Sequence, residues 1–235
     1  YGRKLYLIEN CIYGIDIQPI AVQIAKLRFF ISLTVDEKKQ QGKENLGIRS
    51  LPNLETKFVA ADTLIGLDKP KQLPFRNPEI EKCERNLKEL RHRYFSATTR
   101  TDKLKYQKED KMMRQQIVKL LEMDGWGHKT TEQIVAFDPY NQNTSSSFFD
   151  SEWMFGIKEG FDAVIGNPPY VDIKALPKEE VALYFKIFST TQNRINLYAI
   201  FIEKGFDLLN ENGRLIFINP NSILINESYK KIRKY

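Results

Sequence analysis

Three short apolar segments, each followed by a helix signal or a polar end, constrain the fold of this chain most strongly. They span residues 11–16, 57–61 and 161–165 and are rich in the residues that strands favour. Pro19 suits the first position of a helix, where its missing N–H does no harm. Isoleucine and leucine then recur at positions 20, 24, 27 and 31, which is one face of a 3.6-residue period. The first segment therefore predicts a strand followed by a helix.

The same alternation returns near the end of the chain. A strong helix is expected from about residue 195 to 209, followed by a turn at 210–213 and a strand at 214–218. Strands that alternate with helices indicate an α/β fold, here part of a doubly wound, mostly parallel sheet.

Polar side chains stand where three of these strands end. Asp16 and Asp62 close the first two strands, and Asn167 closely follows the third. In doubly wound sheets, ligands bind outside the carboxyl ends of the strands. The sequence therefore predicts one ligand site that contains Asp16, Asp62 and Asn167. For each aspartate the alternative is a capping role at a helix start.

The loop Asn167-Pro168-Pro169-Tyr170 is the most specific motif in the chain. Each proline fixes its own φ and biases the preceding residue toward an extended backbone, so the loop is stiff. A stiff loop that offers an amide and an aromatic ring suits the positioning of a flat, amine-bearing substrate. The alternative is an ordinary strand exit in which the prolines end the strand.

The string Ile165–Tyr170 resembles the catalytic motif of amino-methyltransferases that use S-adenosylmethionine. The longer stretch Phe149–Val171 is similar to that of adenine-specific DNA methyltransferases in large restriction-modification enzymes of the type IIG kind. The resemblance covers residues 5–67 and 135–233, and it implies a Rossmann-like methyltransferase sheet. It also implies methyl transfer to the exocyclic amine of adenine in DNA.

The resemblance also implies roles for residues of the cofactor side. The motif Gly14–Pro19 is similar to the family's ribose-binding element, in which Asp16 accepts both ribose hydroxyls and Ile17 lies against the adenine ring of the cofactor. Asp62 resembles the acceptor of the amino group on that adenine.

On the catalytic side, two acceptors would act on the target amine. The side-chain oxygen of Asn167 and the carbonyl of Pro168 would each accept one N–H, which draws the nitrogen toward tetrahedral geometry and frees its lone pair for attack. Tyr170 offers a face on which an extruded base can stack.

The segment between the two matching stretches reads as an insertion. We expect three parts: 1–67 and 135–235 as the methyltransferase core, and 68–134 as inserted basic helices. Apolar residues at 80, 83, 87, 90 and 94 predict one helix, and Asp102 is the expected cap of a second that runs to about Met123. The chain has a net charge of +6, and residues 76–122 hold thirteen Lys and Arg against eight Asp and Glu. This excess suggests contact with phosphates, although a solvated helical face explains it equally well.

Part of the family pattern is missing. The Gly-rich cofactor loop, expected one strand before Asp16, is absent, and no later segment is long enough to recognise a DNA sequence. We therefore expect an excerpt of a longer polypeptide that binds S-adenosylmethionine weakly by itself.

Composition narrows the remaining classes. No apolar run approaches the ~20 residues of a membrane span, and no signal-peptide layout is present. Cys11, expected in a buried strand, and Cys83, expected in a helix, form no disulfide or metal pattern. A cytoplasmic protein without a metal is the default.

Two other functions share the same motif. A glutamine methyltransferase acting on proteins uses the same loop, since glutamine also presents a planar amide. The 104 residues between Asp62 and Asn167 are more than such a compact enzyme needs. A nucleic-acid-binding module without catalysis is the third possibility.

Overall fold

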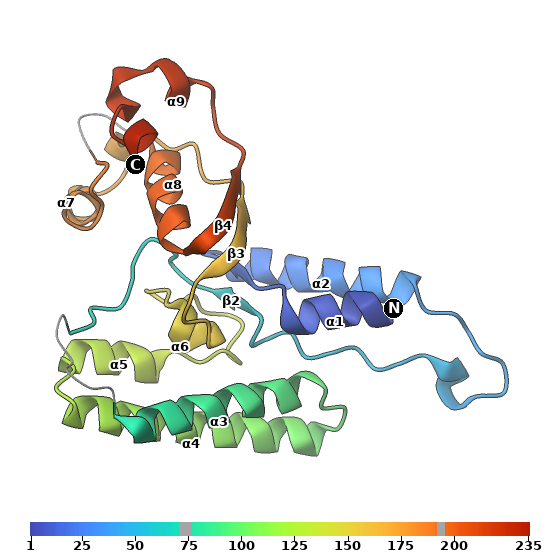
Figure 1. Ribbon diagram of the computed structural model, residues 1–235. Coiled ribbons are helices and arrows are strands. Elements are labelled where there is room, and N and C mark those ends of the chain that lie inside the picture. The colour runs from blue at the N-terminus through green and yellow to red at the C-terminus, as the bar shows by residue number, and fades with distance from the viewer. Residues whose placement is uncertain (71–76, 192–195) are drawn as a thin grey trace. The chain divides into compact units, whose positions relative to one another are not determined.

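The computed structural model describes residues 1–70, 77–191 and 196–235 (Figure 1). Contacts divide the chain into two compact units, Tyr1–Gly156 and Ile157–Tyr235. Each unit contains a pair of parallel strands and several helices, so the α/β class with parallel pairing is confirmed. In the described residues, no helix is both long and apolar enough to cross a membrane.

The first unit is built around a short parallel sheet. Strand β1 (Gly14–Asp16) pairs with β2 (Phe58–Ala60), with Ile15 opposite Val59, and Ser146 adds a parallel bridge beside Ala61. Helices α1 (Gly2–Asn10) and α2 (Pro19–Val35) and the 3-10 turn η1 (Glu44–Gly47) belong to the same unit. The buried core between them consists of Ile8, Val22, Leu33, Leu54, Phe58 and Phe95.

Helix α2 begins at Pro19 as predicted, but the apolar face formed by residues 20, 24, 27 and 31 is not the face that is buried. Ile20 and Ile24 are more than half exposed, as are Leu27 and Ile31, whereas Val22 and Leu33 are buried on the other side. The cause is that α2 is apolar around most of its circumference. A 3.6-residue pattern can then be read on more than one face.

Cys11 was also placed wrongly. It is exposed because it forms the C-cap of α1, ahead of the strand rather than within it. Cys83 is buried in a helix, as expected.

The region expected to be an insertion, residues 68–134, is mostly helical from residue 77 onward. Helices α3 (Pro78–Phe95) and α4 (Arg100–Met123) pack against each other as a hairpin, and α5 (His128–Ala136) packs on α4 (Figure 1). The seam predicted for α3 is buried at all five positions, which are Ile80, Cys83, Leu87, Leu90 and Tyr94. The predicted cap of the second helix was wrong by three residues. Thr99 is the N-cap and accepts a hydrogen bond from the backbone N of Asp102.

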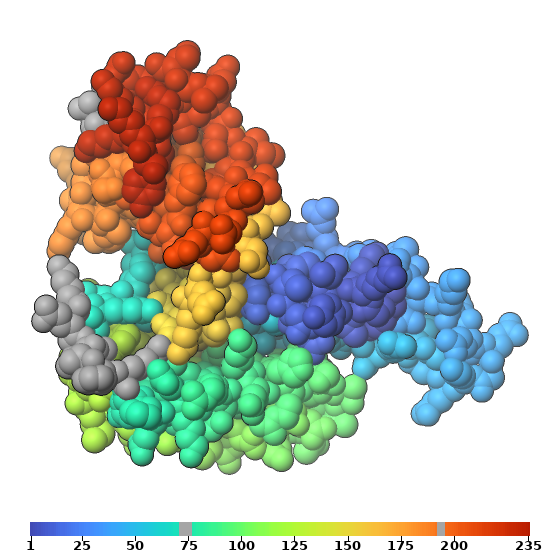
Figure 2. Space-filling view, in the orientation of Figure 1, coloured from blue at the N-terminus to red at the C-terminus, as the bar shows by residue number. Residues whose placement is uncertain are grey.

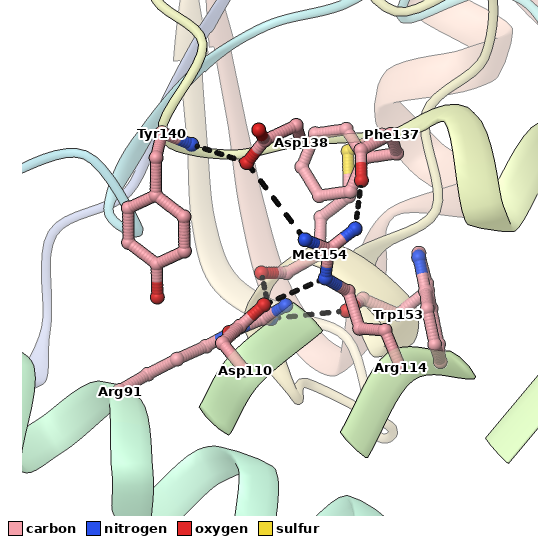
Figure 3. Close-up of polar contacts among 8 residues, drawn as sticks. All are labelled: Arg91, Asp110, Arg114, Phe137, Asp138, Tyr140, Trp153 and Met154. Atoms are coloured by element: carbon pink, nitrogen blue, oxygen red, sulfur yellow. Dashed lines mark hydrogen bonds and ion pairs between the residues drawn. The ribbon is translucent and has the colours of Figure 1, made fainter. Parts of the chain in front are cut away.

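The hairpin is joined to the rest of the first unit by a buried ionic cluster (Figure 3). Asp110 of α4 is fully buried, and its two carboxylate oxygens accept from Nε of Arg91 at 2.9 Å and from Nε of Arg114 at 2.6 Å. Arg91 also donates to the carbonyls of Trp153 at 3.2 Å and Met154 at 2.9 Å. These carbonyls lie in the last turn of α6 (Ser151–Phe155), where no intrahelical donor is left for them.

Arg114 donates to a carbonyl at the end of a second helix, α5. It donates to the carbonyl of Phe137, which is the C-cap residue of α5, and forms an ion pair with Asp138 at 3.7 Å. The side chain of Asn53 holds the end of α3, donating to Tyr94 O and Ala97 O, both at 2.7 Å. One end of each of three helices is thus fixed by a buried polar side chain.

The second unit contains the other strand pair. Strands β3 (Phe161–Gly166) and β4 (Leu209–Phe217) are parallel, and helix α8 (Leu197–Asp207) packs on β4. The remaining elements are η2 (Ile173–Ala175), α7 (Lys178–Ile187), α9 (Ser222–Ile225), η3 (Glu227–Tyr229) and η4 (Ile232–Lys234). Helix α8 confirms the prediction for this stretch, although the expected first residue, Ile195, lies outside the described residues.

Two predictions for this unit were wrong in detail. The turn expected at 210–213 lies inside β4 as an irregularity, because Phe161 pairs with Leu209 while Ala163 pairs with Arg214. Asn210 still forms the local turn contact, accepting from Asn212 N at 3.1 Å. The apolar run of β3 predicts a buried strand, yet Ile165 is 73% exposed. In this unit β3 pairs with β4 alone, so a face of the ribbon has no covering element among the described residues.

Candidate functional site

The carboxyl ends of β1 and β2 bring Asp16 and Asp62 to the same edge of the first unit. The strands are parallel and in register, with Asp16 opposite Ala60. The backbone N of Ala61 donates to the carbonyl of Asp16 at 3.0 Å, so Asp62 follows directly beside it. The structure therefore places Asp16 and Asp62 side by side, and their membership of one ligand site stays a prediction.

Asp16 is exposed, and its side chain stabilises the turn that leads into α2. Its Oδ1 accepts from the backbone N of Gln18 at 2.8 Å. Gln18, and not Asp16, is the N-cap of α2, so the carboxylate is not consumed as a helix cap. Its second oxygen accepts no hydrogen bond from the described residues. Ile17, next in the chain, exposes 58% of its surface beside this carboxylate.

Asp62 is partly buried and more strongly tied into the backbone. Its Oδ1 accepts from Leu64 N at 3.0 Å, and its own N donates to Ser146 O at 2.9 Å. Ser146 belongs to the loop that returns from the inserted helices, so this loop forms the flank of the edge at Asp62. Asp62 thus stabilises a local turn, and not the start of a helix as the alternative had it.

The Asn167–Tyr170 loop lies at the carboxyl end of β3 in the second unit. Asn167 is exposed, whereas Pro168 is buried, so the backbone carrying the Pro168 carbonyl is held in place. The backbone N of Ile218 donates to the carbonyl of Gly166 at 3.2 Å and continues the pairing of β3 and β4 up to the loop. The loop therefore begins directly from a paired strand end.

Tyr170 braces this loop. Its hydroxyl lies 2.8 Å from the carbonyl of Ile218 and 3.2 Å from Oδ1 of Asn167. The ring meets Tyr198 of α8 edge to face, with centroids 6.0 Å apart and an interplanar angle of 86°. About half of the Tyr170 surface remains exposed. Its hydroxyl thus contacts the amide proposed for catalysis, and its ring leaves surface on which another ring can stack.

Sequence reasoning missed the two groups that brace Tyr170. Tyr198 is buried in α8, and its hydroxyl lies 3.2 Å from the hydroxyl of Ser222. The helix that holds Tyr198 is predicted from the sequence, but no periodicity indicates that one of its rings faces the loop. The other group is the backbone carbonyl of Ile218, which no side-chain pattern can identify.

Asn167, Pro168 and Tyr170 belong to the second unit, and Asp16, Ile17 and Asp62 belong to the first. The expectation that all of them form one site therefore stays a prediction.

A family model described as the Eco57I restriction-modification methylase matches residues 10–235. The chain belongs to this family. The match covers both strand pairs, the inserted helices and the Asn167–Tyr170 loop, and it confirms the resemblance inferred from the motifs.

Three curated proteins show how the similarity is distributed. The type II methyltransferase M.TthHB8I of Thermus thermophilus is 37% identical over 84 residues, which are 33% of this chain and 20% of that protein. A putative type II restriction enzyme and methyltransferase of Methanocaldococcus jannaschii, RM.MjaORFECS2P, is 25% identical over 296 aligned residues, covering 100% of this chain and 24% of its own length. The adenine-specific methyltransferase BrxX of Escherichia coli is 29% identical over 86 residues, 37% of this chain and 7% of that protein. The chain thus spans a quarter or less of the length of these relatives.

Proposed function

We propose that this protein transfers a methyl group from S-adenosylmethionine to the exocyclic amine of adenine in DNA, as part of a restriction-modification enzyme. The observation that carries the proposal is the stiff Asn167–Tyr170 loop at the end of a paired parallel strand, with the Asn167 amide exposed and contacted by Tyr170. The relatives named as type II and adenine-specific methyltransferases support the substrate.

The proposed chemistry needs the amine nitrogen to become a nucleophile. The lone pair of an adenine amine is delocalised into the ring, so acceptors must hold both of its N–H bonds out of that plane. Asn167 Oδ1 supplies one acceptor, and the Pro168 carbonyl supplies the other from a buried, ring-locked residue. The nitrogen would then form the new bond to the methyl carbon as the sulfonium S–CH3 bond breaks, its electron pair staying on the sulfur of the departing thioether. The methylated amine would afterwards release one proton to solvent.

Tyr170 would hold the Asn167 amide and the target base in position, and would not itself stabilise charge. Its hydroxyl contact with Asn167 restricts the rotation of the amide, and its exposed ring gives a flipped base a surface for stacking. Acceleration in this scheme comes from orientation and from fixed dipoles, without a covalent intermediate.

The edge at Asp16 fits the nucleoside part of the cofactor. An exposed carboxylate with one oxygen engaged by Gln18 N and the other open to solvent suits two ribose hydroxyls. Ile17 provides an exposed apolar surface for the adenine ring, and Asp62 provides an acceptor for its amine. When bound, S-adenosylmethionine supplies an electrophilic methyl group on a sulfonium.

The proposal extends to the architecture. We propose that both strand pairs are parts of a doubly wound, Rossmann-like methyltransferase sheet, with residues 68–134 as a helical insertion. The parallel pairing within each unit and the position of the polar residues at strand ends support this arrangement.

Tritiated methyl transfer tests the function. The protein at its natural length should label DNA at adenine, and Asn167→Ala should reduce transfer by a factor of 100 or more, an order-of-magnitude expectation for loss of a positioning acceptor. Asn86→Ala, at an exposed position on α3, is the matched control and should retain full transfer. Label in a protein glutamine would favour the protein methyltransferase instead. DNA binding without any transfer would favour a non-catalytic module.

A further inference from the structure

The basic excess of the inserted helices is unevenly distributed. Arg91 and Arg114 are buried in the ionic cluster, where both donate to Asp110, so they add no charge to the surface. Arg76 lies outside the described residues. On α3 the remaining cations and acids balance, with Lys82, Arg85, Lys88 and Arg93 against Glu79, Glu81, Glu84 and Glu89. Helix α3 therefore contributes no net positive charge to the surface.

Helix α4 carries the remaining excess of positive charge. Outside the buried cluster it has six cations, Arg100, Lys103, Lys105, Lys108, Lys111 and Lys119, against three acids, Asp102, Glu109 and Glu122. Two of the acids are engaged: Asp102 accepts from Thr99 Oγ1 at 2.6 Å, and Glu122 accepts from Thr131 Oγ1 at 3.0 Å. None of the six cationic side chains makes a hydrogen bond or ion pair with any residue in the described ranges.

Four of these cations lie on one side of the helix. Arg100, Lys108, Lys111 and Lys119 are separated by 8, 3 and 8 residues, and all four are exposed. At 3.6 residues per turn, these spacings keep the four within roughly 100° of the helix circumference and spread them over about 28 Å of its length. That length approaches one turn of B-DNA, which is about 34 Å.

A different part of the α4 circumference is anchored to the rest of the first unit. Asp110, Arg114 and Ile117 are all buried, and the ion pairs of the first two fix the rotation of α4 about its axis. Figure 2 shows the hairpin segment, in green, as part of the surface of the molecule. A rigid helix with one face locked, and with another face lined by cations that have no partner among the described residues, loses little conformational entropy on binding an extended polyanion.

We propose that this face of α4, defined by Arg100, Lys108, Lys111 and Lys119, contacts the phosphate backbone of duplex DNA independently of sequence. The identity of the polyanion rests on the proposed function. The placement of the contact rests on the charges, their spacing and their lack of partners. Lys and Arg contacts of this kind supply the salt-dependent part of DNA affinity and set register without reading bases.

Salt-dependent binding tests the proposal. The triple variant Arg100→Ala, Lys108→Ala, Lys111→Ala should be compared with a control triple on α3, Lys82→Ala, Arg85→Ala, Arg93→Ala. Both triple variants remove three positive charges, so any difference between them reports where the charges lie and not the net charge of the protein. Affinity of the natural-length protein for a short duplex without a recognition site is measured over a range of salt concentrations. The α4 triple should lower the slope of log K against log salt by about 2 to 3 and weaken binding on the order of tenfold or more. The control triple should lower it by less than about 1.

Equal slope changes in the two triples, or none in either, would overturn the proposal. Circular dichroism of both triples guards against loss of folding. If the α4 triple instead loses binding to phosphatidylglycerol vesicles and keeps its DNA slope, the face is a membrane contact and the proposal fails. The Asn167→Ala variant separates the two hypotheses, because it should keep the wild-type salt slope while losing methyl transfer. Wild-type transfer by Asn167→Ala would contradict the catalytic proposal and leave the α4 result intact.

Discussion

The Nε of Arg91 donates a hydrogen bond to Oδ2 of Asp110 at 2.9 Å, and this contact joins α3 to α4 in a fully buried setting. Burial by itself raises the pKa of the Asp110 carboxyl, but Arg91 and Arg114 beside it outweigh this and hold the pKa below its ordinary value. Nη1 of Arg91 donates to two carbonyls of α6, and five residues separate the end of that helix from the start of β3. The cluster therefore joins the hairpin of α3 and α4 to α6 within the first unit.

Asp110→Asn should destabilise the first unit strongly. The substitution leaves the buried guanidinium of Arg91 without a counter-charge and leaves Arg114 with only the more distant, half-exposed Asp138. Breaking a buried ion pair in this way costs about 3–5 kcal/mol. Chemical denaturation followed by the fluorescence of Trp153 and Trp126 measures the loss. Since the folded-state pKa of Asp110 is depressed, its contribution is present above the ordinary pKa of 3.8 and is lost as the pH falls through the folded-state value.

An exposed pair on the same hairpin provides the control. Arg85 and Glu81 lie 3.9 Å apart on the outside of α3. Glu81→Gln should change the free energy of unfolding by less than about 1 kcal/mol, because exposed ion pairs contribute little. Similar losses in the two variants would show that the buried cluster carries no special share of the stability.

The sequence predicted the hairpin but could not predict its anchor. The apolar seam of α3 identifies its buried face because its residues repeat at helical spacing. Asp110 lies in the run Lys108-Glu109-Asp110-Lys111, which reads as a solvated stretch. It is buried only because the packing of α4 on α3 brings it against Arg91, nineteen positions earlier. Such a pairing depends on the tertiary register of two helices, and neither helix signals it alone.

Tyr170→Phe and Tyr170→Ala should separate the two proposed roles of this residue. Phe keeps the ring but removes the hydroxyl contacts with Ile218 and Asn167, so we expect transfer to fall by about tenfold with little change in DNA affinity. Ala also removes the stacking surface, which is worth about 1–3 kcal/mol per base, so DNA binding should weaken further. Methyl transfer and DNA affinity of both variants are compared with Tyr6→Phe, an exposed tyrosine on α1. Equal behaviour of Phe and Ala would argue against a stacking role.

Asp16→Ala should weaken the affinity for S-adenosylmethionine by about 10- to 100-fold, since hydrogen bonds to a charged group are worth about 1.5–3 kcal/mol. Asp16→Asn keeps an acceptor oxygen and should lose less. Calorimetry with the natural-length protein measures both, and Asp68→Ala, an exposed aspartate without a side-chain contact in the described residues, should bind normally. Unchanged affinity in Asp16→Ala would remove this residue from the proposed cofactor site.

The strand-end residues of the first unit were predictable because parallel strands place their carboxyl ends on one edge. That rule brings Asp16 and Asp62 together as expected. The buried face of α2 was not predictable, since an almost wholly apolar helix has no unique periodic face. The irregularity in β4 was not predictable because residues 210–213 are ordinary turn residues. Only the pairing with β3 shows that the strand continues through them.

Lys57→Met should make stability less dependent on pH. Burial lowers the pKa of Lys57 to about 8, with Lys88 contributing to the decrease and Glu9 opposing it, and the ammonium lies 4.1 Å from the centre of the Tyr13 ring. The unfolded value is near 10.5, so between these two values the unfolded chain binds more protons than the folded one. The wild-type free energy of unfolding should therefore gain a component that rises with pH across this window, by at most a few kcal/mol.

In Lys57→Met that component is absent. The advantage of the variant over wild type should be largest near neutral pH and should shrink as the pH approaches 10.5. Denaturation curves at several pH values measure the difference, and Lys129→Met, an exposed lysine on α5, should follow the wild-type curve. Parallel pH profiles for wild type and Lys57→Met would mean that the folded structure does not depress the pKa of this lysine.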